Sequence, residues 1–536
     1  MREGKQYRKI VRCCASNAIE PNLECKDTFF ACDTYVQIIM SVTASHLYAY
    51  TQCPHRVWRD ANDDPEQKDP VNEFVQLLWE KGTQYEKKIV EENRGALELV
   101  DLSKIPKSER LQPTLEAMNN KAPYIYQGRL EAGELVGEPD LLELQENGEY
   151  MPVDIKSGMG LEGEDEESDG KPKKHYALQL ALYTDALRQL GFATHLLGKI
   201  WDSKGDIVLY DLNAPQGVRN KQTWWELYQD TLPVVRSLLK NETKTEPAMI
   251  SICKLCQWQS TCKKQCIDKK DISLVPELGR SKKEGVNTIA LDVGELARID
   301  VDSVCDAKGK TGIAGIGKSS LEKFVRRAKL QEENAAEPLI LKPYFLPDKP
   351  IELHFDIEAD PTQDIVYLHG VVERRGDIQE FHSFVAEEVS AEAEKDAWVR
   401  FWEYFKSLPR DDVAVYYYSK YERTQYRSLQ KKYPDVISAE EVEDFFDPDF
   451  AIDLYYDIVK PCTDWATYNY SVKTLAQFLG FSWRDKNPSG AASIEWYNDW
   501  CKDKDPVKLQ RILDYNEDDC IAMIYLKDKL AELNRQ

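Results

Sequence analysis

The stretch Val153-Asp154-Ile155-Lys156 decides how the first half of this 536-residue sequence is interpreted. Alternate residues of a β-strand point to the same face, so Asp154 and Lys156 are expected to share one face. A second carboxylate, Asp140, precedes them in the chain. Two carboxylates can bind Mg²⁺ or Mn²⁺, and a nearby ammonium can orient water at a scissile phosphate. Taken alone, the stretch also fits an exposed strand with a surface ion pair, which is the commoner case.

Regular elements surround this stretch on both sides. The acidic segment 161–170, with six Asp or Glu in ten residues, is typical of a solvated loop. Turn residues separate three strand-like segments, from which we expect a small antiparallel sheet. The strand-like segments are 124–130, 135–144 and 150–155, and helical spacing of apolar residues occurs at 45–59, 71–92, 177–190 and 223–239. We therefore predict one domain over residues 40–268, after a poorly ordered extension at 1–39.

The helix expected after the acidic segment carries Gln179 and Tyr183, which share one helix face because they are four residues apart. Together with Asp140, Asp154 and Lys156, this order resembles the RecB-like branch of the PD-(D/E)XK nucleases. That branch places an Asp before a strand ending in Asp/Glu-x-Lys, and its next helix carries Gln-x-x-x-Tyr. The resemblance implies a restriction-endonuclease-like core with these five residues in its catalytic centre.

The first long helix departs from that pattern. Many relatives carry a His near a Gly in this helix, whereas Gly82 is followed here by Tyr85 and Glu86. We expect Glu86 to be a substitute metal ligand.

Four cysteines frame the predicted nuclease core: Cys53 precedes it, and Cys253, Cys256 and Cys262 follow it. Four thiolates can hold a zinc ion or an iron–sulfur cluster. Structural zinc more often uses two close Cys pairs, whereas one distant Cys plus C-x2-C-x5-C resembles the cluster of RecB-family nucleases. The resemblance implies a [4Fe-4S] cluster that clamps both ends of the domain. Zn²⁺ and unliganded thiols are the alternatives.

The middle of the chain is locally basic. Residues 263–330 carry 15 Lys or Arg and 10 Asp or Glu. Segments 274–299 and 311–330 resemble helix–hairpin–helix units, and glycines before a helix let backbone amides approach a phosphate. We therefore predict a helix–hairpin–helix-like connector over 269–335, with a turn between two packed helices as the alternative interpretation. Its expected nucleic-acid contacts are Gly315, Gly317, Lys318, Arg326 and Arg327.

A second acidic centre is expected near the C-terminus. Asp356 and Glu358 share one face of a predicted strand, and Tyr515 lies four residues before Asp519 in a predicted helix. A strand with this carboxylate pair is common by chance. With the distant Tyr-x-x-x-Asp, the pattern resembles the DEDD-type 3′–5′ exonucleases of the ribonuclease H-like fold. The resemblance implies two metals bridged by the carboxylates and a Tyr hydroxyl that orients water.

The middle acidic position of that pattern is altered. Relatives have an Asp where Glu422 stands in this sequence, and Asp453 is a second candidate for the same position. We expect the corresponding ribonuclease H-like domain to span residues 345–536.

Composition limits the remaining function classes. The formal charge is -23, from 93 Asp or Glu and 70 Lys or Arg, which argues against coating nucleic acid through bulk charge. No apolar run reaches the roughly 20 residues of a membrane-spanning helix, and the N-terminal residues lack the apolar segment of a secretory signal. We expect a cytoplasmic protein with no membrane partner. Its 13 cysteines favour a metal or cluster site over a disulfide framework.

The order of these features over residues 41–531 resembles bacterial RecB-like nucleases that join an iron–sulfur PD-(D/E)XK domain to a ribonuclease H-like domain. The resemblance implies an α/β multidomain, metal-dependent nuclease that hydrolyses DNA in repair, recombination or defence, with a second 3′–5′ exonuclease-like centre. The expected partners are DNA, single-stranded or with free ends, and a helicase. An RNA-processing nuclease and a non-catalytic DNA-binding scaffold are the alternatives, the latter because of the missing His and of Glu422.

Overall fold

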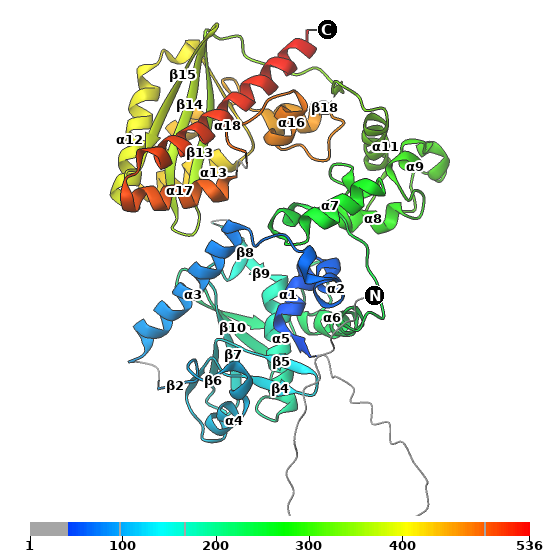
Figure 1. Cartoon of the computed structure of the whole chain (residues 1–536), viewed down its shortest axis with the longest axis vertical. Helices are drawn as coiled ribbons and strands as arrows, with labels where there is room; N and C mark the ends of the chain where they lie inside the picture. The colour runs from blue at the N-terminus through cyan, green and yellow to red at the C-terminus, as the bar shows by residue number, and fades with distance from the viewer. Residues whose placement is uncertain (1–40, 96–97, 166–167, 487–488, 536) are drawn as a thin grey trace, which may run out of the picture. The chain divides into compact units, whose positions relative to one another are not determined.

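The computed structural model describes residues 41–95, 98–165, 168–486 and 489–535, so the predicted extension at 1–39 lies outside the described residues. The first part of the chain is built on a six-stranded sheet in the order β11-β10-β7-β6-β3-β2 (Figure 1). The sheet is mixed, because β7 runs antiparallel to β6 but parallel to β10. The three strand-like segments predicted to form a small antiparallel sheet do pair antiparallel, as β3, β6 and β7, and the further strands β2, β10 and β11 enlarge it into this mixed sheet. Helix α5 (Lys174–Gln189) lies between β7 and β10 in the chain, and such a crossover returns the chain in the parallel direction.

Helix α5 packs on this sheet, and its buried residues include Leu178, Leu182 and Leu187. The strands of this part are β1 (Val42–Thr43), β2 (Leu99–Asp101), β3 (Tyr124–Tyr126), β4 (Leu130–Ala132), β5 (Leu135–Gly137), β6 (Leu141–Leu144), β7 (Tyr150–Ile155), β10 (Leu197–Trp201) and β11 (Ile207–Asp211). The helices besides α5 are α1 (Ala44–Gln52), α2 (Pro54–Asn62), α3 (Glu73–Asn93), α4 (Leu111–Asn119), α6 (Trp224–Leu239) and α7 (Gln259–Asp268).

The acidic segment predicted to be a loop forms a hairpin instead. Strands β8 (Leu161–Asp165) and β9 (Ser168–Pro172) pair antiparallel. Glu162 lies opposite Lys171 in this ladder, and opposite charges across a strand pair stabilise it. The basic residues that follow the acidic run therefore compensate part of its charge.

Residues 272–328 contain a separate small apolar core, in which Leu296 and Val286 pack with Leu321 and Phe324. The helices here are α8 (Gly279–Val286), α9 (Val293–Ala297), α10 (Val301–Val304) and α11 (Lys318–Glu332).

The C-terminal part contains a five-stranded sheet in the order β15-β14-β13-β16-β17. The first three strands are antiparallel neighbours, and β16 and β17 continue the sheet in parallel with β13. The strands are β13 (Ile351–Asp360), β14 (Ile365–Arg375), β15 (Ile378–Val385), β16 (Val413–Tyr417) and β17 (Ala451–Asp453), with a separate pair of β12 (Leu339–Ile340) and β18 (Thr463–Asp464).

Two helical layers cover the faces of this sheet (Figure 1). Leu353, Phe355 and Ile357 pack in a core with α12, α13 and α14, so the alternate residues of β13 face the layer that contains α18. That layer brings the C-terminal helix across the carboxylates of β13. The helices are α12 (Ala391–Ser407), α13 (Tyr421–Lys432), α14 (Ala439–Phe445), α15 (Lys460–Cys462), α16 (Val472–Phe478), α17 (Gly490–Asp503) and α18 (Pro506–Leu533).

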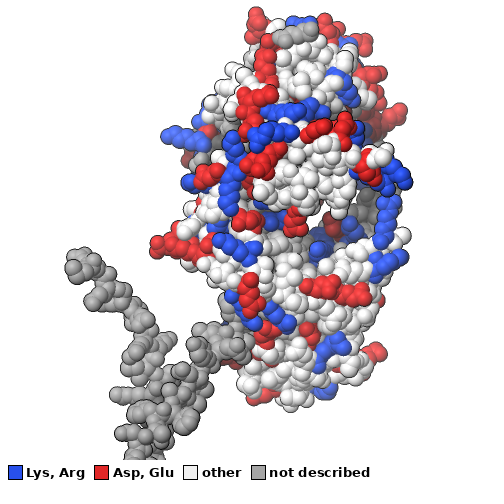
Figure 2. Space-filling view, turned by 90° about the vertical axis from the view of Figure 1, so that its right-hand side faces the viewer, with Lys and Arg blue, Asp and Glu red and all other residues white. Residues whose placement is uncertain are grey.

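None of the described helices combines the length and the apolar character that crossing a bilayer requires. On the face drawn in Figure 2, Lys and Arg side chains are interspersed with Asp and Glu side chains.

Candidate active sites

Three predicted carboxylates of the C-terminal part meet between β13 and α18. One oxygen each from Asp356, Glu358 and Asp519 lies within 4.8 Å of the other two. Within the described ranges, no other set of three Asp, Glu, His or Cys residues meets this distance. Three carboxylate oxygens are the ligands that Mg²⁺ and Mn²⁺ prefer, so this three-carboxylate group fits such an ion.

Burial and mutual repulsion destabilise the negative charges of the three-carboxylate group and so raise the pKa values of its members. Burial, followed by the charges of Asp519 and Glu358, raises the pKa of Asp356 well above its ordinary range. Burial and the charge of Asp519 raise the pKa of Glu358 to about 8, and burial also raises the pKa of Asp519. A bound divalent cation would offset this repulsion.

Two supporting residues that sequence reasoning missed hold the three-carboxylate group. Asn516 Nδ2 donates to Asp356 Oδ2 (2.8 Å), and Trp483 Nε1 donates to Asp519 Oδ1 (2.7 Å). Asn516 can approach because β14 carries Gly370, where a side chain would collide with the amide. The position of Asn516 beside Tyr515 was a usable signal, whereas Trp483 has no local sequence signal.

The other predicted residues of this centre lie outside the three-carboxylate group and have different contacts: Tyr515, Glu422 and Asp453. Tyr515 is buried, and its hydroxyl accepts a hydrogen bond from Lys473 Nζ (2.7 Å). Glu422 is buried on α13, and its charge contributes to the raised pKa of Asp356, but it lies outside the three-carboxylate group. Asp453 accepts backbone N–H groups of Ser419, Tyr455 and Tyr456. Its carboxylate therefore caps the following helical segment, and of the two candidates it is Glu422 whose charge acts on Asp356.

The first predicted centre lies where β7 ends. Asp154 is buried in β7, and its Oδ2 lies 2.8 Å from Lys156 Nζ. Asp140 comes between β5 and β6, and its Oδ2 accepts the N–H of Ile155 (2.8 Å). Burial and the charge of Asp154 raise the pKa of Asp140 well above its ordinary range, while Lys156 opposes this shift. The strand register thus brings together the three residues expected to act in this centre.

The remaining predicted members of this centre come from two helices. Glu86 on α3 accepts a hydrogen bond from Gln127 Nε2 (2.5 Å), and its charge contributes to the raised pKa of Asp140. Tyr183 on α5 is buried, and the charges of Asp154 and Asp140 add to the effect of burial in raising its pKa. The buried Oε1 of Gln179 has no hydrogen-bond partner in the described part of the chain.

The four predicted cluster cysteines line one cavity of about 450 Å³. Cys53 lies between α1 and α2, and the other three lie around the start of α7. Burial raises the pKa of Cys262 to about 12, and the neighbouring Cys53, Cys253 and Cys256 thiolates add to this shift. All four are free thiols, so the fold brings together residues about 200 positions apart without a disulfide.

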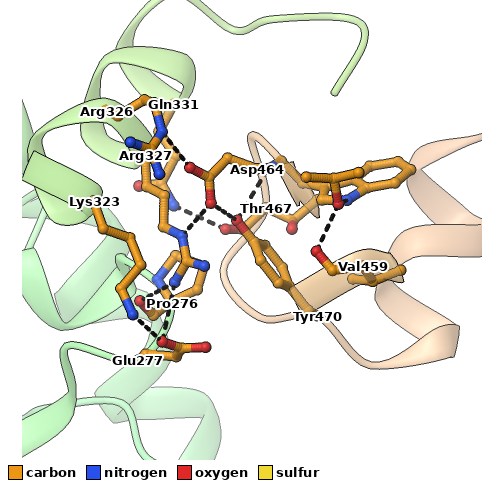
Figure 3. Close-up of polar contacts among 12 residues, drawn as sticks. Pro276, Glu277, Lys323, Arg326, Arg327, Gln331, Val459, Asp464, Thr467 and Tyr470 are labelled. Carbon is orange, nitrogen blue, oxygen red and sulfur yellow. Dashed lines mark hydrogen bonds and ion pairs between the residues drawn. The ribbon is translucent and has the colours of Figure 1, made fainter. Parts of the chain in front are cut away.

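The two predicted nucleic-acid-binding arginines of α11 face the C-terminal part instead (Figure 3). Arg327 Nε and Arg326 Nε donate to the two carboxylate oxygens of the fully buried Asp464, at 2.6 and 2.5 Å. Tyr470 also donates to this carboxylate (3.2 Å). Only 1% of Arg327 is exposed, so its guanidinium is inaccessible to a phosphate. The predicted nucleic-acid contact of Arg327 was therefore wrong, because a carboxylate 137 residues away buries this side chain.

The other predicted contacts of the connector lie before α11. Gly315 has a φ of +71°, a backbone conformation that favours glycine, and Gly317 precedes the first residue of α11 without a side-chain cap. Lys318 remains partly exposed and pairs with Asp302 (2.5 Å). Backbone amides near this helix start are thus free of a capping side chain.

Comparison with protein families gives two matches. The model described as the PD-(D/E)XK nuclease superfamily matches residues 43–263, and the model described as the RNase_H superfamily matches residues 353–531. The comparison with curated proteins gave no match. The two predicted fold types are confirmed, and the mixed α/β sheets agree with them. This protein therefore combines a PD-(D/E)XK nuclease superfamily domain and an RNase H superfamily domain in one chain.

Proposed function

We propose that this protein is a metal-dependent nuclease that hydrolyses DNA phosphodiester bonds at two centres. The observation that carries the proposal is the three-carboxylate group, which lies in the RNase H superfamily domain of a chain that also contains a nuclease superfamily domain. The resemblance of the first domain to RecB-like nucleases supports DNA as the substrate. The same resemblance supports a role in repair, recombination or defence with a helicase partner.

In the second centre, Asp356, Glu358 and Asp519 would hold a divalent cation, which would stabilise charge on the attacking and leaving oxygens. Asn516 and Trp483 keep two of these carboxylates in place through the hydrogen bonds described above. The Tyr515 hydroxyl orients the water that attacks the phosphodiester in line. This centre is proposed to digest DNA from 3′ ends.

In the first centre, Asp140 and Asp154, with Glu86, would hold a cation of the same kind. Lys156 Nζ, beside Asp154, balances charge near the scissile phosphate and orients water. Although burial opposes it, the charges of Asp154 and Asp140 raise the pKa of Lys156. The lysine therefore carries a full positive charge at neutral pH.

The substrate is tested with matched labelled DNA and RNA, each single-stranded, duplex and flapped, in Mg²⁺, in Mn²⁺ and in EDTA. We expect metal-dependent cleavage of DNA and none in EDTA. Preferential cleavage of RNA would favour the RNA-processing alternative. Salt-sensitive binding without cleavage would favour a DNA-binding scaffold.

Metal binding at the second centre is expected to depend on pH. The pKa of Glu358 is raised from 4.5 to about 8, so below that pH a metal must displace its proton. Mn²⁺ affinity of an Asp154→Ala variant should rise below pH 8 by about tenfold per pH unit for each displaced proton. Calorimetric titration in buffers of different ionisation enthalpy measures the Mn²⁺ affinity and the number of protons that the metal displaces.

The control for this prediction is Glu358→Gln, which removes one titrating group and should reduce the number of displaced protons. The same shift makes metal-free protein lose stability as pH rises from 4.5 to about 8, because the folded state holds a proton that the unfolded chain releases. An Mn²⁺ affinity that is constant below pH 8 would contradict this prediction.

We also propose that the four cysteines hold a [4Fe-4S] cluster. The four thiols line one cavity, as ligands of one metal centre would. The single distant Cys53 followed by C-x2-C-x5-C resembles the cluster site of RecB-family nucleases, which favours a cluster over zinc.

Anaerobically purified protein should therefore be brown and contain iron and sulfide, and Cys256→Ser should lose both. Cys305→Ser, at a cysteine outside this cavity, is the matched control. Colourless protein with stoichiometric zinc would contradict the cluster.

A further inference from the structure

Lys473 on α16 reaches into the second centre. Its Nζ donates a hydrogen bond to the Tyr515 hydroxyl (2.7 Å) and lies 3.9 Å from Asp519 Oδ2. The same atom lies 4.5 Å from the ring centroid of Tyr515 and 5.9 Å from that of Trp483. The ammonium is therefore held between two aromatic rings and a carboxylate.

The charge of Lys473 acts on the whole three-carboxylate group. It opposes the effect of burial on the pKa of Asp356, of Glu358 and of Asp519. With 30% of its side chain exposed, Lys473 lies at the edge of the site and also faces solvent. One ammonium thus partly offsets the negative charge of three carboxylates, which lie on β13 and α18.

The hydrogen bond from Lys473 limits what the Tyr515 hydroxyl can still bind. A hydroxyl has one proton to donate and two lone pairs that accept. Lys473 occupies one lone pair. An ammonium can only donate, so the proton of the hydroxyl points away from Lys473 Nζ. The remaining lone pair can accept a hydrogen bond from a water molecule.

We propose that Lys473 is a positioning residue of the second centre: it holds the Tyr515 hydroxyl so that the remaining lone pair accepts a proton of the attacking water. A water held through its proton directs an oxygen lone pair away from Tyr515 and toward the phosphorus. The inference rests on the proposed exonuclease function of this centre. Lys473 also weakens the attraction of the three-carboxylate group for cations, because its own charge is positive.

Lys473→Met tests the inference in an Asp154→Ala background, in which only the second centre acts. Methionine keeps the packing on the Tyr515 and Trp483 rings but removes the donor and the charge. We expect kcat for 3′-end digestion to fall about tenfold or more, with KM within about twofold. Lys473→Arg should recover part of kcat, because it restores the charge and a donor. Lys502→Met, at an exposed lysine of α17, is the control and should leave kcat unchanged.

A second readout is independent of turnover. Electron paramagnetic resonance of bound Mn²⁺, at a pH above the raised pKa of Glu358, should show affinity about threefold or more tighter in Lys473→Met. A purely structural role predicts weaker binding or none. Tighter metal binding together with slower digestion is thus the signature of the proposed role.

A double-mutant cycle with Tyr515→Phe separates the remaining outcomes. Once the hydroxyl is gone, Lys473→Met should cause little further loss of kcat. Independent losses, an unchanged kcat in Lys473→Met, or weaker Mn²⁺ binding would each overturn the inference. A parent protein that neither binds Mn²⁺ at this centre nor digests DNA would overturn the proposed function and the inference with it. An active parent with an unaffected Lys473→Met variant would overturn the inference alone.

Discussion

Replacing Asp154 with alanine is expected to lower cleavage by the first centre about 10³-fold, measured in an Asp356→Ala background that silences the second centre. The buried Asp154 carboxylate is a proposed metal ligand and the ion-pair partner of Lys156, at 2.8 Å. Its removal takes away both the ligand and the group that fixes the ammonium. The loss should therefore appear mainly in kcat.

Two controls separate this chemical loss from a folding defect. Asp154→Asn keeps the shape of the side chain but not its charge, so cleavage should fall nearly as far as in the alanine variant. Asp230→Ala, at an exposed residue of α6, should retain full cleavage. Initial rates on labelled DNA measure cleavage, and circular dichroism shows whether each variant is folded. Cleavage by Asp154→Asn within about threefold of the parent would contradict the assigned role.

Replacing Asp464 with alanine is expected to lower the free energy of opening of α11 by about 3–5 kcal/mol. Asp464 is fully buried and pairs with Arg326 and Arg327 (Figure 3), and 1% of Arg327 is exposed. Without the carboxylate, the Arg327 guanidinium remains buried with its principal charge partner removed. Its Nη1 still donates to the Pro276 carbonyl (2.9 Å) and lies 3.6 Å from Glu277 Oε2, a more distant carboxylate than Asp464.

Hydrogen exchange of the α11 amides measures this loss locally, which avoids treating a multidomain chain as a two-state folder. Asp528→Ala is the matched control, because Asp528 is half exposed in its ion pair with Arg374 and should contribute at most about 1 kcal/mol. Exchange of α11 that is unchanged in Asp464→Ala would show that the pair contributes no net stability.

Much of the second centre could be predicted because its signals are local. The two-residue period of a strand places Asp356 and Glu358 on one face, and the helical period relates Tyr515 to Asp519. The structure brings the three carboxylates of this set together. Local period does not predict Lys473 or Trp483, since both reach the centre only through tertiary packing.

Long-range contacts also explain the features that local sequence patterns did not predict. A basic pair such as Arg326-Arg327 predicts an exposed charged surface, but the carboxylate of Asp464 comes from a distant segment of the chain. The mixed sheet depends in the same way on how α5 returns the chain to β10, which strand spacing alone does not determine. Burial at such positions is a property of the fold and not of the local sequence.

The most direct test of the two-centre account is the cleavage of end-labelled DNA in Mg²⁺ or Mn²⁺ by four proteins: the wild type, Asp154→Ala, Asp356→Ala and the double variant. The account predicts partial loss in each single variant and loss of all metal-dependent cleavage in the double variant. Wild-type cleavage by the double variant would contradict both proposed centres.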